Sequence, residues 1–391
     1  MKKNILSQLM LATAFAIPAT LTSCLNNDEE TIVLETPVNN TGIPDDSEAD
    51  PNPYVDEDNA NAYIPNIQTT LDDVDGTPVI RIDMTGVQDP NDAGWMKLYG
   101  TGSPNQNIWV EVDGMPKGID VYNSADGEGS KTIMTDIIFT IDNSGSMSEE
   151  ADAIARDILS WAQQLENSGL DMRFGIVGYD GHITGAINLT NVKELKAFLD
   201  YSTGTSRTNH FEGTDANTLQ TAANEFANSY YECGAAAIQY ADKNFKFRAG
   251  ANRIYVNFTD EPNQPNSNSK YSVKYFESQS NWPASKGTVH TIYSSGKFEN
   301  NNWNREEQPW LISEYTGGTT MFASSSFTGV TLSSLPVTGA MQNSYIIRFT
   351  NIDDMLDGQP HKVHITIRSK DGSVQGDKTF YVVFGQKQAN S

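Results

Sequence analysis

Cysteine is nearly absent from the chain, with two in 391 residues. One of them, Cys24, directly follows an apolar N-terminal stretch, which leaves only Cys233 for the remainder. A single thiol cannot form an internal disulfide. The sequence therefore excludes a disulfide-stabilised scaffold, and packing must stabilise the fold.

Basic residues are also scarce, at 26 Lys and Arg against 50 Asp and Glu, and the net charge is −24. The acidity is uneven: residues 1–25 carry +2, residues 26–80 carry −14 without any Lys or Arg, and the rest carries −12. Nucleic-acid phosphates demand clustered basic side chains. A nucleic-acid partner is therefore not expected.

Long apolar runs are missing beyond the N-terminus, where Lys2 and Lys3 precede the stretch 5–21. That stretch is short and rich in small residues, which is typical of a cleaved export signal and not of a membrane span. We predict a signal peptide over residues 1–23. The next residue is Cys24.

The segment Leu21-Thr22-Ser23-Cys24 resembles the lipobox of bacterial lipoproteins. That resemblance implies a lipidated Cys24 as the first mature residue and an anchor in the outer membrane. The acidic residues that follow resemble the export signal of surface lipoproteins in Bacteroidetes-type bacteria, which implies a cell-surface location. A plain acidic spacer is the alternative, so a periplasmic or an outward orientation both stay open.

The remaining chain divides into four segments by composition and pattern. An acidic stretch rich in Asn, Pro and Thr predicts a disordered tether over 24–65. Short strand patterns predict β structure over 66–131 and again over 343–391, which we expect to join in one β-sandwich. The β patterns before and after the middle segment are 79–84, 95–99, 107–112, 119–122, 345–350, 361–368 and 379–384.

The middle segment, 132–342, alternates apolar strand patterns with helical periodicity. Strands are expected at 133–141, 173–179, 186–189, 253–258, 288–293 and 319–322. Helices are expected at 149–168, 191–201, 215–243, 304–316 and 327–342. This alternation predicts an α/β fold class with a doubly wound, mostly parallel sheet.

Three oxygen-bearing side chains, Asp142, Ser144 and Ser146, lie between the expected strand 133–141 and the expected helix 149–168. Carboxyl ends of parallel strands form the usual ligand crevice of such sheets, and helix N-termini add free N–H groups. Oxygen ligands of this kind suit a hard divalent cation. Serine and aspartate are also common in turns and helix caps, so this motif alone is weak.

The pattern Asp142-x-Ser144-x-Ser146 resembles the metal-ion-dependent adhesion site of von Willebrand factor A domains. That resemblance implies the same Rossmann-like fold over 132–342 and two further ligands, Thr214 and Asp260. It also implies bound Mg²⁺, with Mn²⁺ and Ca²⁺ as alternatives, and a protein partner whose carboxylate completes the shell. Glu212 and Glu261 depart from the family pattern, in which Gly is common at both places.

The sequence thus predicts a surface lipoprotein that is not an enzyme and that binds a protein or other acidic ligand through a divalent cation. The loops 143–149, 205–213 and 261–285 would select the partner. One alternative is a tip or accessory subunit of a surface fibre. Another is a metal-dependent hydrolase, since dehalogenase-like phosphatases also place an Asp after a strand, although Ser144 stands where they need a second carboxylate. The ligand and the oligomeric state stay open.

Overall fold

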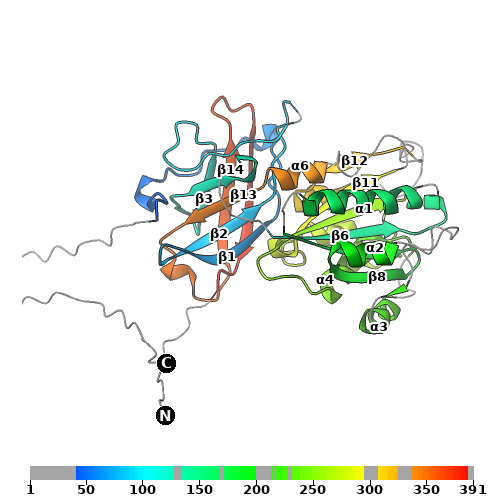
Figure 1. Cartoon of the computed structure of the whole chain (residues 1–391). Coiled ribbons are helices and arrows are strands. Elements are labelled where there is room, and N and C mark those ends of the chain that lie inside the picture. The colour runs from blue at the N-terminus through cyan, green and yellow to red at the C-terminus, as the bar shows by residue number, and fades with distance from the viewer. Residues whose placement is uncertain are drawn as a thin grey trace, which may run out of the picture. The chain divides into compact units, whose positions relative to one another are not determined.

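A computed structural model describes most of the chain from residue 41 onward (Figure 1). The described residues are 41–92, 94–126, 134–148, 150–167, 171–199, 213–214, 217–226, 231–294, 307–324 and 336–385. The described residues belong to one compact unit. The predicted signal peptide, Cys24 and the tether up to residue 40 lie outside the described residues.

Two antiparallel sheets each combine strands from the early and late parts of the chain (Figure 1). The first, in spatial order, contains β1 (Ile67–Val74), β2 (Thr77–Met84), β13 (Tyr345–Phe349) and β5 (Asp120–Asn123). The second contains β15 (Gln375–Val382), β14 (His361–Arg368), β3 (Ile108–Val112) and β4 (Met115–Pro116). Their apolar side chains form one core, which includes Ile82, Ile347, Val110 and Ile365. Early strands therefore need late strands in order to bury their apolar faces.

The first hairpin follows directly from its turn residues. Asp75 and Gly76 both have positive φ, 52° and 83°, between Val74 and Thr77, which pair across the turn. Two consecutive residues of this kind form the turn that matches the twist of paired strands. Asp75 and Gly76 thus form the turn of a β-hairpin.

A third sheet has seven strands. In spatial order they are β12 (Thr320–Phe322), β11 (Thr288–Tyr293), β10 (Asn252–Thr259), β6 (Thr135–Asp142), β7 (Met172–Tyr179), β8 (Ile183–Thr190) and β9 (Gly213–Thr214). β7 and β8 pair antiparallel and the other neighbours pair parallel. The sheet is therefore mixed.

Helices in the described residues are few and mostly short. The α-helices are α1 (Ala151–Asn167), α2 (Val192–Leu199), α3 (Asn217–Glu225), α4 (Gly234–Asn244), α5 (Trp310–Thr316) and α6 (Pro336–Gln342). The 3₁₀ helices are η1 (Asp46–Glu48), η2 (Glu57–Asn59), η3 (Ser124–Asp126), η4 (Ser146–Ser148), η6 (Ser269–Tyr271), η7 (Val273–Phe276), η8 (Ala284–Lys286) and η12 (Asp353–Met355). No helix in the described part of the chain is both long and apolar enough to cross a bilayer.

The predicted fold class is wrong: the described chain is mostly β, with two antiparallel sheets and one mixed sheet, and is not a doubly wound α/β fold. One reason is the tight connection after Tyr179, which returns β8 antiparallel to β7. Another is that the helix expected over 215–243 is interrupted, because Cys233 has an extended backbone and α4 begins only at Gly234. Periodicity overestimated the helix content.

The tether prediction is also wrong for residues 41–65, which pack against the antiparallel sheets. Ile43, Val55 and Ile64 are buried there. The buried ammonium of Lys117 donates to the Asp46 carboxylate at 2.5 Å. Contacts this distant in sequence leave no periodic pattern, so composition alone suggested disorder.

Candidate cation site at the end of β6

Asp142, the last residue of β6, is fully buried and forms the centre of the candidate site. Its Oδ1 accepts a hydrogen bond from the backbone N–H of Ser144 at 3.0 Å. Its Oδ2 accepts from the Thr259 hydroxyl of β10 at 2.8 Å. Neutral donors thus orient the carboxylate, but neither of them carries a positive charge.

The two serine hydroxyls and Asp260 complete a chain of oxygen atoms. The Oγ atoms of Ser144 and Ser146 lie 3.0 Å apart, and Ser146 Oγ donates to Asp260 Oδ1 at 3.0 Å. β6 and β10 pair in parallel, with Ile141 opposite Phe258, so both strands end at the same level. The register of this pair therefore brings four of the five predicted ligands together.

Thr214, the fifth predicted ligand, is placed only by its backbone. It forms β9 with Gly213 and pairs with Ala186 of β8. Its side chain, Glu212 and the predicted partner loop up to residue 212 lie outside the described residues. The structure therefore leaves the role of Thr214 a prediction.

Among the described residues, Asp142 is a buried acid without a basic partner. Burial, aided by the charge of Glu232, raises the pKa of Asp142 to about 7, against the hydrogen bonds from Ser144 and Thr259. An ionised carboxylate in such surroundings is unfavourable unless a cation neutralises it. The site therefore favours either a proton or a metal ion.

Further acids surround the same strand ends. Burial, together with Glu261, Asp180 and Asp260, raises the pKa of Glu232 to about 7. Burial and the nearby Asp260 and Asp142 raise the pKa of Glu261 as well. Within the part of the chain that the structure describes, the main causes of these shifts include no Lys or Arg. The rim therefore attracts cations.

Sequence reasoning missed two members of this acidic rim, Glu232 and Asp180. Asp180 directly follows β7, so the strand-end argument that found Asp142 could have found it. Glu232 was hidden inside the expected helix 215–243. In the structure it precedes α4, and it accepts a hydrogen bond from Gln264 Nε2 at 3.0 Å.

The donor set fits a hard divalent cation. All four side chains offer oxygen, and two of them are carboxylates, which suits Mg²⁺ with retained waters. Within the described residues no group of three or more His, Cys, Asp or Glu is placed to hold a metal. The candidate site at the end of β6 is of another kind, because two of its four side chains are serines and only two are carboxylates. Asp142, Ser144, Ser146 and Asp260 would hold the ion.

No protein-family model matches the chain, and no curated protein does. Among solved structures, the pilus adhesin SpaC from Lactobacillus rhamnosus GG in an open conformation is similar with a TM-score of 0.31 and 12% identity, over 87% of this chain and 56% of that chain. A second crystal structure of SpaC gives 0.30 and 11%, over 85% and 49%. The chain thus spans about half the length of these structures. Likeness this distant identifies neither the family nor the function.

Proposed function

We propose that this chain is a surface binding protein that contacts an acidic group of a protein partner through one divalent cation at the end of β6. Asp142, Ser144, Ser146 and Asp260 hold the ion, and Thr214 is the fifth ligand. Mg²⁺ is the expected ion, and Mn²⁺ and Ca²⁺ are alternatives. The cation neutralises the buried carboxylate and offers an open position to the partner's carboxylate.

One observation carries this proposal: within the described residues, the fully buried Asp142 is bonded only to neutral donors, next to two serine hydroxyls and Asp260. A buried carboxylate of this kind is unfavourable unless a proton or a cation neutralises it, and the neighbouring oxygen atoms suit a cation. The set lacks a second carboxylate two residues after Asp142, because that residue is Ser144. The chemistry therefore supports binding over phosphoryl transfer.

The lipobox-like segment adds the location. A lipidated Cys24 would anchor the chain in the outer membrane, and the acidic residues after it favour export to the cell surface. Adhesion and assembly of a surface fibre are two forms of the same cation-dependent contact. In fibre assembly, the partner is a neighbouring subunit. A chelator should then dissociate the oligomer, which size-exclusion chromatography would detect.

Titration calorimetry of the full chain with MgCl₂ and MnCl₂ tests the proposal. We expect one site per chain, and Asp142→Ala should weaken binding by more than the roughly 10–100-fold typical of losing an indirect metal contact. Asp180→Asn is the matched control, since it removes a nearby charge without removing a ligand. It should weaken binding by no more than about threefold, because Asp180 is partly exposed and solvent screens its charge.

Two results would count against the site. Unchanged affinity in Asp142→Ala would place the ion elsewhere. Equal losses in Asp142→Ala and Asp180→Asn would mean that diffuse charge, not coordination, attracts the cation. Circular dichroism of both variants in EDTA separates loss of the site from loss of the fold.

A further inference from the structure

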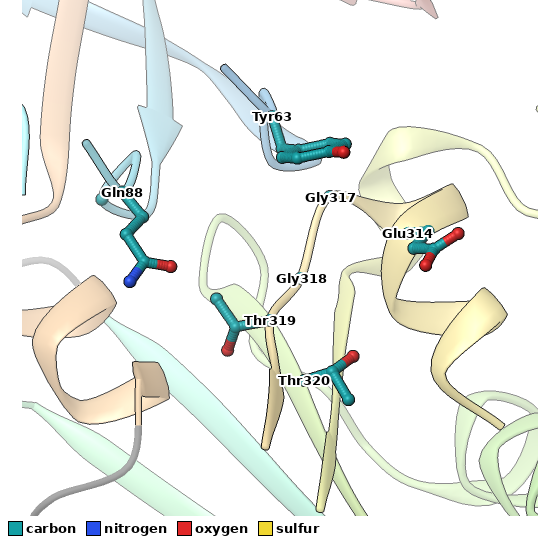
Figure 2. Close-up of a pocket in the computed structure, with 8 residues that line it drawn as sticks. Tyr63, Gln88, Glu314, Gly317, Gly318, Thr319 and Thr320 are labelled. Atoms are coloured by element: carbon teal, nitrogen blue, oxygen red, sulfur yellow. The ribbon is translucent and has the colours of Figure 1, made fainter. Parts of the chain in front are cut away.

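Three neighbouring cavities form a row that shares no residue with the cation site. The first has a volume of about 230 Å³, and Tyr63, Gln88, Glu314 and Thr320 line it (Figure 2). The second, of about 240 Å³, shares Tyr63 and Glu314 with the first. The third, of about 310 Å³, shares Asp377 with the second. A ligand that occupied all three would be an extended chain.

Exposed aromatic rings lie along this row. Tyr63 lines the first two cavities and is 68% exposed, and Tyr54 lines the third and is 80% exposed. In Figure 2 the Tyr63 ring lies at the rim of the cavity, next to Gly317. Each ring offers a flat apolar face with a polar tip. Such faces stack well on the C–H side of a sugar ring.

The backbone that carries Tyr63 is held in place by the end of α5. Gly317 ends the helix with φ of 74°, and a Cβ atom there would lie 2.4 Å from the Ile64 carbonyl oxygen. The N–H of Asn66 also donates to the Thr316 carbonyl at 3.2 Å. Glycine is therefore required where the two segments touch. A ring on such a fixed segment is already oriented for a ligand.

Polar groups along the row are available for hydrogen bonds. The Gln88 amide and the Thr320 hydroxyl, both in the first cavity, bond to no other side chain or backbone group in the described residues. Beside the third cavity, the Oδ1 atom of Asn52 is buried without a partner in the same part of the chain. Amide and hydroxyl groups can each pair with sugar hydroxyls.

The same region is poorly suited to a peptide that adds a strand. The outward edge of β15 is already bonded, since the N–H groups of Asn61 and Ala62 both donate to the Gln375 carbonyl. Gln279 Nε2 donates to the Thr379 carbonyl on that strand. Strand addition requires free backbone groups at a sheet edge. Side chains, not backbone, are left to recognise a ligand here.

The acidic side chains that line the row disfavour a negatively charged ligand. Glu314, Asp377 and Glu111 all line it. Its one Lys, Lys378, donates to the Ile64 carbonyl and to Asn66 Oδ1, at 3.2 and 3.1 Å, and so is engaged within the protein. Acidic sugars would meet like charge without a free basic side chain.

We infer that this row of cavities binds a neutral or amine-bearing oligosaccharide, with Tyr63 as the stacking platform and Gln88 and Thr320 as hydroxyl partners. The site is separate from the proposed cation site. Sugar binding should therefore persist in EDTA, and either site can fail without the other.

The test uses the full chain in EDTA and a panel of defined hexasaccharides: cellohexaose, maltohexaose, mannohexaose, N-acetylchitohexaose and the chitosan hexamer, with hexagalacturonate as the acidic probe. We expect calorimetric binding of at least one neutral or amine-bearing probe and none of hexagalacturonate. Tyr63→Ala should weaken that binding about tenfold or more, the scale of losing a central aromatic contact. Tyr63→Phe should retain it.

Tyr381→Ala is the matched control, because Tyr381 is 56% exposed and lines none of the three cavities. It should bind sugar like the wild type. Absence of binding across the panel, or equal losses in Tyr63→Ala and Tyr381→Ala, would overturn the inference. So would tight binding of a Lys-rich peptide that Tyr63→Ala abolishes, since the row would then recognise a basic peptide.

Discussion

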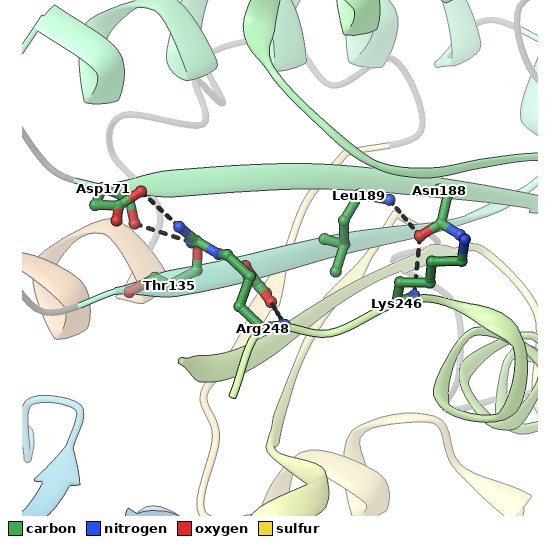
Figure 3. Close-up of polar contacts among 7 residues, drawn as sticks. Thr135, Asp171, Asn188, Leu189, Lys246 and Arg248 are labelled. Carbon is green, nitrogen blue, oxygen red and sulfur yellow. Dashed lines mark hydrogen bonds and ion pairs between the residues drawn. The ribbon is translucent and has the colours of Figure 1, made fainter. Parts of the chain in front are cut away.

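The two ends of β6 each carry a fully buried aspartate, and they treat that charge in opposite ways. At the start of the strand, Asp136 accepts from Arg248 Nε at 2.7 Å and from the Arg248 backbone N–H at 2.8 Å. The same guanidinium contacts Asp171 and the Thr135 carbonyl (Figure 3). At the other end, Asp142 has only neutral donors.

Within the described residues, the two charges are therefore treated differently. Arg248 neutralises Asp136 from within the chain. Asp142 has no basic partner in the same part of the chain, and under the proposed function a cation from solution would neutralise it. A buried charge without a partner reduces stability, and such a residue is a strong indication of a ligand site.

The largest expected effect comes from removing the partner at the first end. Arg248→Met leaves Asp136 buried and unpaired, which should lower the free energy of unfolding by about 3–5 kcal/mol. Urea denaturation at pH 7 measures it. The double variant Asp136→Asn with Arg248→Met should recover a large part of the loss. A single-variant loss below about 1 kcal/mol, the level of an exposed pair, would remove the contrast between the two ends.

A cation should produce the next largest effect, at the other end. MgCl₂ at 100 times its dissociation constant should raise the free energy of unfolding by about 2.7 kcal/mol. Asp142→Asn should show no such increase. Thermal unfolding with and without MgCl₂ measures both, and equal stabilisation of the two proteins would place the ion elsewhere.

Asp142→Asn should also change how stability depends on pH when no metal is bound. Since burial raises the pKa of Asp142 from 3.8 to about 7, its contribution in EDTA is most favourable below pH 3.8 and is lost as the pH rises towards 7. Asp142→Asn should therefore be at least as stable as the wild type in EDTA at pH 8. A clearly less stable variant there would mean that the ionised carboxylate stabilises the fold.

His361, in the antiparallel sheets, is a partner whose charge depends on pH, so it is intermediate between the paired Asp136 and the Asp142 carboxyl. His361 is nearly buried, and its ring lies 2.7 Å from Asp113 Oδ2 and 3.1 Å from Asp357 Oδ1. Burial lowers its pKa, but hydrogen bonds and charge from the two aspartates outweigh this and raise the pKa above 6.5. The protonated pair thus stabilises the fold fully below pH 6.5 and loses that contribution as the pH rises through the folded pKa.

His361→Gln should consequently lower stability by about 1 kcal/mol at pH 5.5, because the aspartates are half exposed and solvent screens them. At pH 8.5 the difference should shrink. Denaturation at both pH values measures it. A difference that grows with pH would mean that the neutral ring, not the charge, makes the favourable contact.

Local patterns allowed prediction of several strands. The expected strands 173–179 and 253–258 lie within β7 and β10, because apolar runs of that length are buried on both faces. The end of a strand pattern drew attention to Asp142, whereas Asp260 was implied only by the family resemblance, and its role as a ligand stays a prediction.

What the sequence did not reveal depends on contacts between distant residues. Helical spacing continued smoothly through Cys233, yet the chain is extended there, and a Cβ atom on Gly234 would lie 2.8 Å from the Asn257 amide of β10. The break in the helix thus depends on a strand that comes later in the sequence. Lys117 fixes residues 41–65 in the same long-range manner.

The smallest expected effect provides the baseline for the comparison of the two buried aspartates. Lys97 and Asp126 form an ion pair at 2.7 Å, but their side chains are 48% and 39% exposed. Water already solvates both charges, so Lys97→Gln should change the free energy of unfolding by less than about 0.5 kcal/mol, and 1 M NaCl should abolish even that. Urea denaturation of Lys97→Gln and Arg248→Met side by side compares the two losses in the free energy of unfolding. If the two variants lose similar stability, burial does not decide the value of a charge pair in this protein. The lack of a basic partner for Asp142 among the described residues would then no longer point to a ligand.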